Sequence, residues 1–295
     1  MNRFVTHFVV AALASAALIA CTDRATAQPE NKTPKMENTT APDTASVKVE
    51  VETTAGNFTV LLYGDTPKHR DNFVKLVNEG YYNGTLFHRV IKDFMIQAGD
   101  PDSRTAPKGA ALGSGGPGYK IDAEIVFPKH FHKRGALAAA RQGDQVNPMR
   151  QSSGSQFYVV TGTKLDSAQI AQMERHLKNS RMQSAFNRLA MANIDSIRAM
   201  QSRGDRQGLQ ALQDSLISQA TAEVEADKTP AMTDEMRQAY TTVGGAPHLD
   251  GDYTVFGEII DGMDVVDRIE KAQTDGRDRP VDDIKILSMK VLSEK

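Results

Sequence analysis

The chain contains no tryptophan, a single cysteine and almost no net charge. Its 295 residues include 35 basic and 37 acidic side chains, which gives a formal charge of −2. A single cysteine cannot form a disulfide within one chain, and a near-neutral charge gives no reason to expect a nucleic-acid partner. The seven histidines are scattered without the spacing of metal ligands. We therefore predict no nucleic-acid partner and no metal site.

The sequence also lacks an apolar run long enough to cross a bilayer as a mature helix. Residues 8–20 form a short continuous apolar run that follows one basic residue, Arg3. A short apolar run of this kind near the N-terminus is typical of a secretory signal peptide rather than of a folded element. We therefore predict that residues 1–20 are a signal peptide.

The end of this segment, LIAC at residues 18–21, resembles a bacterial lipobox. In a lipobox, small residues precede a cysteine that is lipidated and becomes the new N-terminus. The only cysteine of the chain, Cys21, falls at this position. We therefore predict a lipoprotein anchored through Cys21 to a membrane of the bacterial cell envelope, either periplasmic or surface-exposed. The alternative is an ordinary signal peptide cleaved nearer Ala25 or Ala27.

The next segment, residues 21–45, has no apolar periodicity. It is rich in threonine, proline, alanine and charged residues, and such a composition cannot bury enough apolar surface to fold. We predict a flexible tether that holds the following domain away from the membrane.

Residues 46–295 carry the patterns of a mainly β domain. Val47, Val49 and Val51 alternate with charged residues, as in a half-buried strand, and a turn at residues 55–57 leads to a second alternating run at 58–62. Further short strand patterns follow, with few helices and regular turns between them. These patterns predict a closed antiparallel barrel or a sandwich.

Two helices are expected within this β domain. Thr66 followed by Pro67 predicts a helix start, with Thr66 as the N-cap, and Gly80 marks its end. A second short helix is expected at residues 263–269. The glycine-rich run at residues 109–118 lacks the Gly-Lys-Ser/Thr ending of a phosphate-binding P-loop, and we interpret it as a long surface loop.

The chain is organised around residues 87–101, which read FHRVIKDFMIQAGDP. The stretch contains two strand-like runs that bend around Lys92 and Asp93. Because side chains alternate between the faces of a strand, Met95 and Gln97 share a face, and Arg89 lies opposite His88. Taken alone, the stretch is equally compatible with a hairpin that carries an exposed arginine.

Together with three later stretches, this segment resembles the cyclophilin-type peptidyl-prolyl isomerases. The later stretches are GSGGPGY, GSQFYVV and HLDGDYTVFGEI, and they occur in the order of the family. The resemblance runs from about Val47 to Val291 with one large interruption. It implies an eight-stranded closed antiparallel barrel, capped by two helices, with the active site in a groove on its outer face.

The resemblance also implies the roles of individual residues. Arg89 matches the key catalytic arginine, and Gln97 matches a glutamine that supports this arginine and the substrate backbone. The residues that match peptide-binding positions are Phe94, Met95, Ala140, Arg141, Gln156, Tyr158, His248, Leu249 and Tyr253.

Four of these residues depart from the best-known eukaryotic pattern. Tyr158 replaces a pocket phenylalanine, and Arg141 stands where an asparagine contacts the substrate through its main chain. His248 and Tyr253 stand where tryptophan and histidine are common. The resemblance therefore gives no prediction of cyclosporin sensitivity. The expected main-chain contact at Arg141 survives the change of side chain.

The implied reaction is rotation about the X-Pro bond in proline-containing clients. Amide resonance raises a barrier of roughly 18–20 kcal/mol, and twisting the bond localises a lone pair on the proline nitrogen. An arginine that hydrogen-bonds this lone pair only in the twisted state lowers the barrier, and no cofactor is needed. The alternative is a cyclophilin-like binding module or chaperone that holds proline segments without turnover.

A helical insertion at residues 164–243 interrupts the resemblance. Asp166 and Gln169 form a capping pair, and apolar residues then recur at helical spacing in four groups. The stripes are expected either to pack on one another as a subdomain or to form a client-binding arm. Because the matching residues lie outside it, we expect its deletion to leave a folded, active barrel. The oligomeric state is not predicted.

Overall fold

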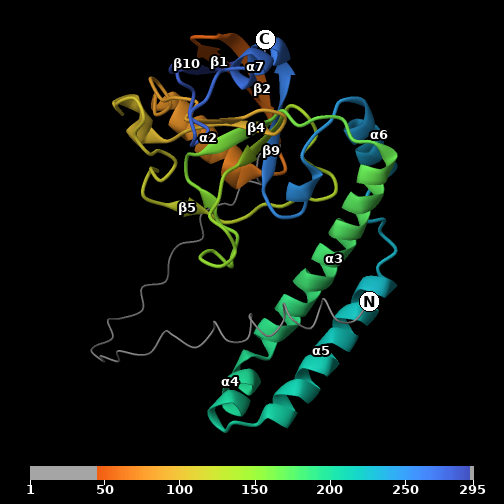
Figure 1. Ribbon diagram of the computed structural model, residues 1–295. Helices are drawn as coiled ribbons and strands as arrows, with labels where there is room; N and C mark the ends of the chain where they lie inside the picture. Colours follow the sequence, from red (N-terminus) through yellow and green to blue (C-terminus); the bar gives the residue numbers. More distant parts are fainter. Residues whose placement is uncertain (1–44, 293–295) are drawn as a thin grey trace, which may run out of the picture. The chain divides into compact units, whose positions relative to one another are not determined.

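The structure is a computed structural model that describes residues 45–292 (Figure 1). The predicted signal peptide, the lipidation of Cys21 and nearly all of the predicted tether lie outside the described residues. No helix within residues 45–292 combines the length and the hydropathy that a bilayer-spanning segment requires.

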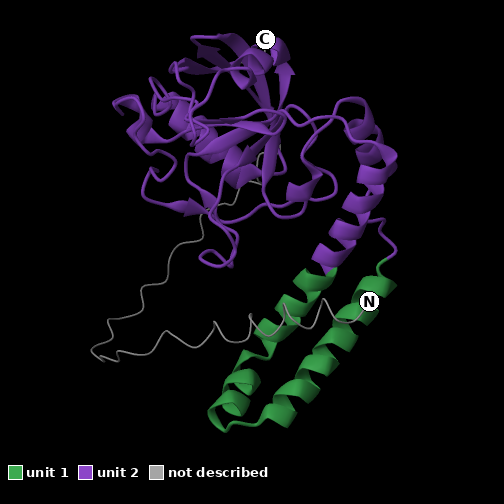
Figure 2. Ribbon diagram, in the orientation of Figure 1, with its two compact units in different colours: residues 1–40, 182–227 green, residues 41–181, 228–295 purple. Residues whose placement is uncertain are grey.

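The described chain divides into two compact units (Figure 2). The larger unit contains residues 45–181 and 228–292, and the smaller one contains residues 182–227. The strands of the larger unit are β1 (Val47–Thr53), β2 (Gly56–Leu62), β3 (Arg89–Ile91), β4 (Met95–Ala98), β5 (Lys120–Ile121), β6 (Ala136–Ala139), β7 (Ser152–Ser153), β8 (Phe157–Val160), β9 (Val255–Asp261) and β10 (Ile286–Leu292).

Eight of these strands form one curled antiparallel sheet in the order β10-β1-β2-β9-β6-β8-β4-β3. The predicted closed barrel is not confirmed, because β3 and β10 end the described sheet and do not pair as strands. The chain just before β3 nevertheless lies beside the start of β10, where Leu86 and Lys285 form an isolated bridge. Strands β5 and β7 pair separately.

The main core lies between one face of this sheet and two helices, α2 (Pro67–Asn78) and α7 (Met263–Glu270) (Figure 1). Alternation along the strands sends Ile96, Leu137 and Val159 into this core. Met95, Ala138 and Tyr158 belong to a second cluster. The alternation therefore separates a sealed core face from a second face on which polar groups can be placed.

The start of α2 differs from the predicted cap. The Thr66 side chain makes no cap hydrogen bond and donates instead to the Tyr63 carbonyl at 3.3 Å. The carboxylate of Glu124 accepts hydrogen bonds from the backbone N–H groups of Lys68 and His69 at 3.0 and 2.9 Å. A carboxylate distant in sequence therefore satisfies the free donors of the first turn.

The insertion forms four helices, which are α3 (Ser167–Ala192), α4 (Ile194–Ser202), α5 (Arg206–Ala226) and α6 (Asp234–Thr242). Its capping pair is present, because Asp166 and Gln169 exchange two hydrogen bonds of 2.8 Å. The first two predicted stripes belong largely to one continuous helix, α3, since no glycine or proline separates them.

The two ends of the insertion pack within the larger unit. Ile170 and Leu177 of α3 join Met236 and Tyr240 of α6 in a buried cluster around Phe131, which lies outside the insertion. Arg181 donates hydrogen bonds to the carbonyls of residues 229 and 230 at 2.7 and 2.8 Å. The stripes of these segments therefore pack partly on the β domain and not only on one another.

The smaller unit contains the end of α3 and all of α4 and α5 (Figure 2). Its buried cluster is formed by Ala185, Phe186, Leu216 and Ala220. Asp205 caps α5 by accepting a hydrogen bond from the Gly208 N–H at 2.8 Å. In this unit the stripes pack on one another, as in the first of the two interpretations of the insertion.

Candidate active site

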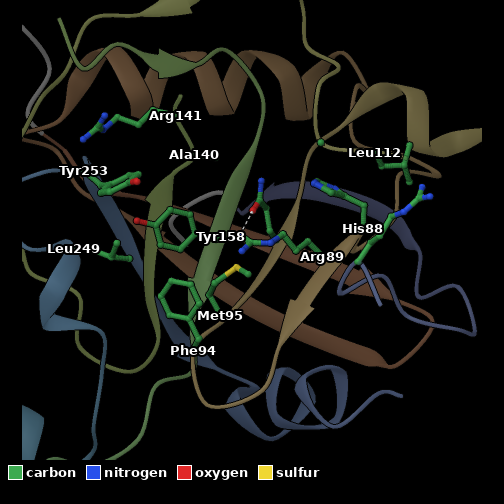
Figure 3. Close-up of a pocket in the computed structure, with 13 residues that line it drawn as sticks. His88, Arg89, Phe94, Met95, Leu112, Ala140, Arg141, Tyr158, Leu249 and Tyr253 are labelled. Atoms are coloured by element: carbon green, nitrogen blue, oxygen red, sulfur yellow. Dashed lines mark hydrogen bonds between the residues drawn. The ribbon is translucent and has the colours of Figure 1, made fainter. Parts of the chain in front are cut away.

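A pocket of about 320 Å³ opens in the larger unit beside β3, β4 and β8 (Figure 3). Nine of the eleven residues predicted to catalyse or bind line it, namely Arg89, Phe94, Met95, Gln97, Ala140, Arg141, Tyr158, Leu249 and Tyr253. The strand alternation thus brings together residues from three separate parts of the chain.

Arg89 and Gln97 are held together by the β3–β4 hairpin. They are direct partners in the strand register, and Asp93 forms the turn with a φ of 61°. The Arg89 guanidinium donates to the Gln97 side-chain oxygen at 3.4 Å (Figure 3). Its Nε atom lies 3.6 Å from the Asp278 carboxylate, and 42% of the side chain remains exposed. Gln97 and Asp278 thus fix the Arg89 guanidinium at the pocket, and its exposed part remains accessible to a substrate.

Gln156 does not line the pocket and instead supports Gln97 from behind. The Gln97 amide donates to the Gln156 side-chain oxygen at 3.0 Å, and the Gln156 amide donates to the Gly115 carbonyl at 2.8 Å. Because each amide both accepts and donates, the chain fixes the Gln97 oxygen toward Arg89. The predicted direct contact of Gln156 with substrate stays a prediction, but its position favours an indirect role.

The apolar part of the pocket is formed by Phe94, Met95, Tyr158 and Leu249. Met95 and Tyr158 are buried, while Phe94 and Leu249 are partly buried against the same cluster. His248 does not line the pocket, but its ring lies 5.1 Å from that of Phe94. These side chains offer an apolar surface of the kind that a proline ring prefers.

Arg141 and Tyr253 form one wall of the pocket. The Arg141 guanidinium lies 4.4 Å from the centre of the Tyr253 ring, donates to the Asp252 carbonyl at 2.8 Å and pairs with Asp144 at 2.6 Å. With its donors engaged by the protein, this side chain is less available to a substrate than its main chain. The prediction of a main-chain contact is compatible with this arrangement.

The pocket is also lined by four residues that were not predicted from the sequence, namely His88, Leu112, Gly113 and Arg277. His88 was expected on the face opposite Arg89, but β3 begins at Arg89, so the strand alternation does not extend to it. Within residues 45–292 neither ring nitrogen of His88 has a hydrogen-bond partner. Burial lowers the pKa of His88 below its ordinary value, which favours the neutral imidazole.

Leu112 and Gly113 belong to the glycine-rich run at residues 109–118, where the structure describes a loop and no phosphate-binding helix. The Gly113 N–H donates to the buried Asp100 carboxylate. Gly113 has a φ of +97°, which favours glycine. The run is therefore a pocket wall as well as a surface loop. The sequence did not show that Asp100 holds this loop beside the pocket.

The sequence is similar to known proteins over most of its length. Residues 47–222 and 217–291 match the family described as cyclophilin type peptidyl-prolyl cis-trans isomerase/CLD. The chain is 26% identical over 255 residues to the peptidyl-prolyl cis-trans isomerase CYP18-2 of Arabidopsis thaliana, with 85% of this chain and 97% of the relative covered.

Other relatives differ in how much of their own length the chain spans. It is 30% identical over 261 residues to a Streptococcus pyogenes protein named as a bifunctional phosphatase/peptidyl-prolyl cis-trans isomerase, covering 87% of this chain but 40% of that protein. A crystal structure of a cyclophilin type isomerase from Cryptosporidium parvum aligns with a TM-score of 0.49 at 21% identity, covering 85% and 100% of the two chains.

The match to the family spans all of the sheet but Leu292, both of the helices that cover it and every residue that lines the pocket. The chain belongs to the cyclophilin-type peptidyl-prolyl cis-trans isomerase family.

Proposed function

We propose that this protein catalyses rotation about X-Pro bonds in exported polypeptides and so assists their folding, while a lipid at Cys21 anchors it to a membrane of the bacterial cell envelope. The observation that carries the catalytic part is the Arg89 guanidinium, which Gln97 and Asp278 hold at the edge of an apolar pocket.

The arrangement suits a reaction that needs no covalent step. Twisting the X-Pro bond removes the amide resonance and leaves a lone pair on the proline nitrogen. Arg89 remains charged at all physiological pH values and presents fixed N–H donors. A donor that meets the lone pair only in the twisted state stabilises the transition state selectively. Arg89 therefore lowers the barrier without binding the planar peptide more tightly.

The apolar side chains provide the other half of the mechanism. Phe94, Met95, Tyr158 and Leu249 hold the proline ring while the preceding carbonyl rotates. Fixing one side of the rotating bond places the nitrogen within reach of Arg89, so that less freedom is lost in the transition state.

Turnover of a short proline peptide tests the catalytic proposal. The purified protein is added to an assay in which a protease cleaves only the trans form of an Ala-Pro peptide. We expect the slow phase to accelerate in proportion to enzyme concentration. Binding of the peptide with the slow phase at the buffer rate would instead identify a module that holds proline segments without turnover.

The anchor is supported by the LIAC sequence at residues 18–21 and by the uniqueness of Cys21. We expect the wild-type protein to fractionate with membranes and its first mature residue to be a cysteine of increased mass. The Cys21→Ser variant should lose this lipid, and the neighbouring Thr22→Ala variant should keep it. A wild-type chain cleaved after residue 25 or 27 would contradict the anchor.

A further inference from the structure

A buried chain of hydrogen bonds connects the last helix of the insertion to the apolar part of the pocket. Tyr240 of α6 donates from its hydroxyl to Asp250 Oδ2 at 2.5 Å. Asp250 Oδ1 lies 2.9 Å from His132 Nδ1, and His132 Nε2 lies 3.0 Å from the Tyr158 hydroxyl. All four residues are buried and belong to the larger unit.

The chemistry of the partners sets the direction of these hydrogen bonds. Burial raises the pKa of Tyr158 and of Tyr240 well above the ordinary value, so both hydroxyls keep their protons. A carboxylate only accepts, and in a neutral imidazole one nitrogen donates while the other accepts. Because Asp250 only accepts, His132 Nδ1 donates to it, and in the neutral imidazole Nε2 then accepts the Tyr158 O–H.

Asp250 is the centre of the chain. Its carboxylate accepts three hydrogen bonds, from the backbone N–H of His132 at 2.8 Å, from His132 Nδ1 and from Tyr240. A buried carboxylate is tolerated when such donors replace its hydration. Loss of the Tyr240 hydroxyl would leave Oδ2 without this donor and would release the carboxylate that orients His132.

We propose that Tyr240 is a positioning residue of the isomerase pocket: acting through Asp250 and His132, it fixes the ring of Tyr158, on which the proline of the client rests. The inference rests on the proposed isomerase function. It explains how a tyrosine can stand at this position without offering the substrate a free donor, because the Tyr158 hydroxyl already donates its hydrogen bond to His132.

A double-mutant cycle separates this role from a purely structural one. Tyr240→Phe keeps the ring that packs edge-on against Phe131 at 5.6 Å and removes only the hydroxyl. We expect it to lower kcat/KM for a short Ala-Pro peptide about tenfold. In the Tyr158→Phe background, which disconnects the pocket from the chain, the same change should lower kcat/KM less than about twofold.

A matched control uses another buried tyrosine, which takes no part in this chain of hydrogen bonds. The Tyr82 hydroxyl donates to the Ser155 carbonyl at 3.3 Å. Tyr82→Phe should have the same effect on kcat/KM in both backgrounds. Equal factors for Tyr240→Phe in both backgrounds would overturn the proposal.

Two measurements keep the proposal testable if an activity readout fails. Unfolding in denaturant of the wild type, Tyr240→Phe, Tyr158→Phe and the double variant gives the coupling free energy between Tyr240 and Tyr158 without any need for turnover. An inactive wild type would then contradict the proposed function but leave this measurement intact. A coupling free energy of zero in these unfolding experiments would overturn the proposed role of Tyr240. The ¹⁵N shifts of the wild-type imidazole should show His132 protonated at Nδ1 and not at Nε2; the opposite tautomer would contradict the assigned direction.

Discussion

The two parts of the insertion differ in what their apolar stripes pack against. The base, residues 164–181 and 228–243, shares a buried cluster with Phe131 of the β domain and supplies Tyr240 to Asp250. The tip, residues 182–227, has a cluster of its own around Phe186 and Leu216. One insertion in the sequence is therefore two parts in the structure, and its base packs with the β domain that contains the pocket.

The largest expected effect is that of deleting residues 164–242, which are the insertion except for its last residue. The deletion removes Ile170, Leu177, Met236 and Tyr240 from one cluster. Each large buried side chain contributes about 2–5 kcal/mol, and a domain of this size is stable by only about 5–15 kcal/mol. We now expect the shortened protein to lose its cooperative thermal unfolding and its peptide turnover.

This expectation reverses the one from the sequence alone, which treated the insertion as dispensable. A shortened protein that still unfolds cooperatively and turns over Ala-Pro peptides at the wild-type rate would show that the base, like the tip, is not needed for the stability and activity of the β domain.

A matched pair of core truncations sharpens the same contrast. Met236→Ala in the base should lower the free energy of unfolding of the unit that contains the pocket by about 2–5 kcal/mol. Phe186→Ala in the tip should destabilise the tip by a similar amount. Hydrogen exchange resolved by residue can separate the two, since amides of β4 and β8 should lose protection only in Met236→Ala. Loss of protection in those strands in both variants would contradict the division.

The smallest expected effect is that of deleting the tip alone. Arg181 already reaches the carbonyls of residues 229 and 230, so a short glycine linker between 181 and 228 can close the gap at a small entropic cost. We expect turnover of a short Ala-Pro peptide to change less than about twofold. A variant with an equally long glycine linker inserted into the intact tip loop at residues 203–205 serves as the control. A severalfold loss of turnover in the deletion would place the tip in the catalytic unit.

Much of the fold and of the pocket follows from local patterns. The alternation of Val47, Val49 and Val51 predicts β1, and the motif around Arg89 predicts the hairpin that aligns this residue with Gln97. Both depend on neighbours within a few residues, where the period of a strand governs which side chains share a face.

The features that could not be predicted depend on contacts between distant segments. Arg277 reaches the pocket from the loop before β10, and Glu124 caps a helix 55 residues away in sequence. The stripe of α3 is continuous, but its packing partners change near residue 182, which periodicity does not reveal. The closed barrel was expected by resemblance, whereas the described sheet ends at β3 and β10.

The role of Arg89 is the central claim, and the kinetics of Arg89→Ala test it most directly. The variant should lower kcat/KM for an Ala-Pro peptide by at least about 100-fold, while the dissociation constant of the peptide, measured by titration, changes less than about threefold. Arg268→Ala is the matched control, because Arg268 pairs with Asp264 on the exposed side of α7 and should leave both quantities unchanged. Parallel losses of affinity and rate in Arg89→Ala, or no loss of rate at all, would contradict the mechanism.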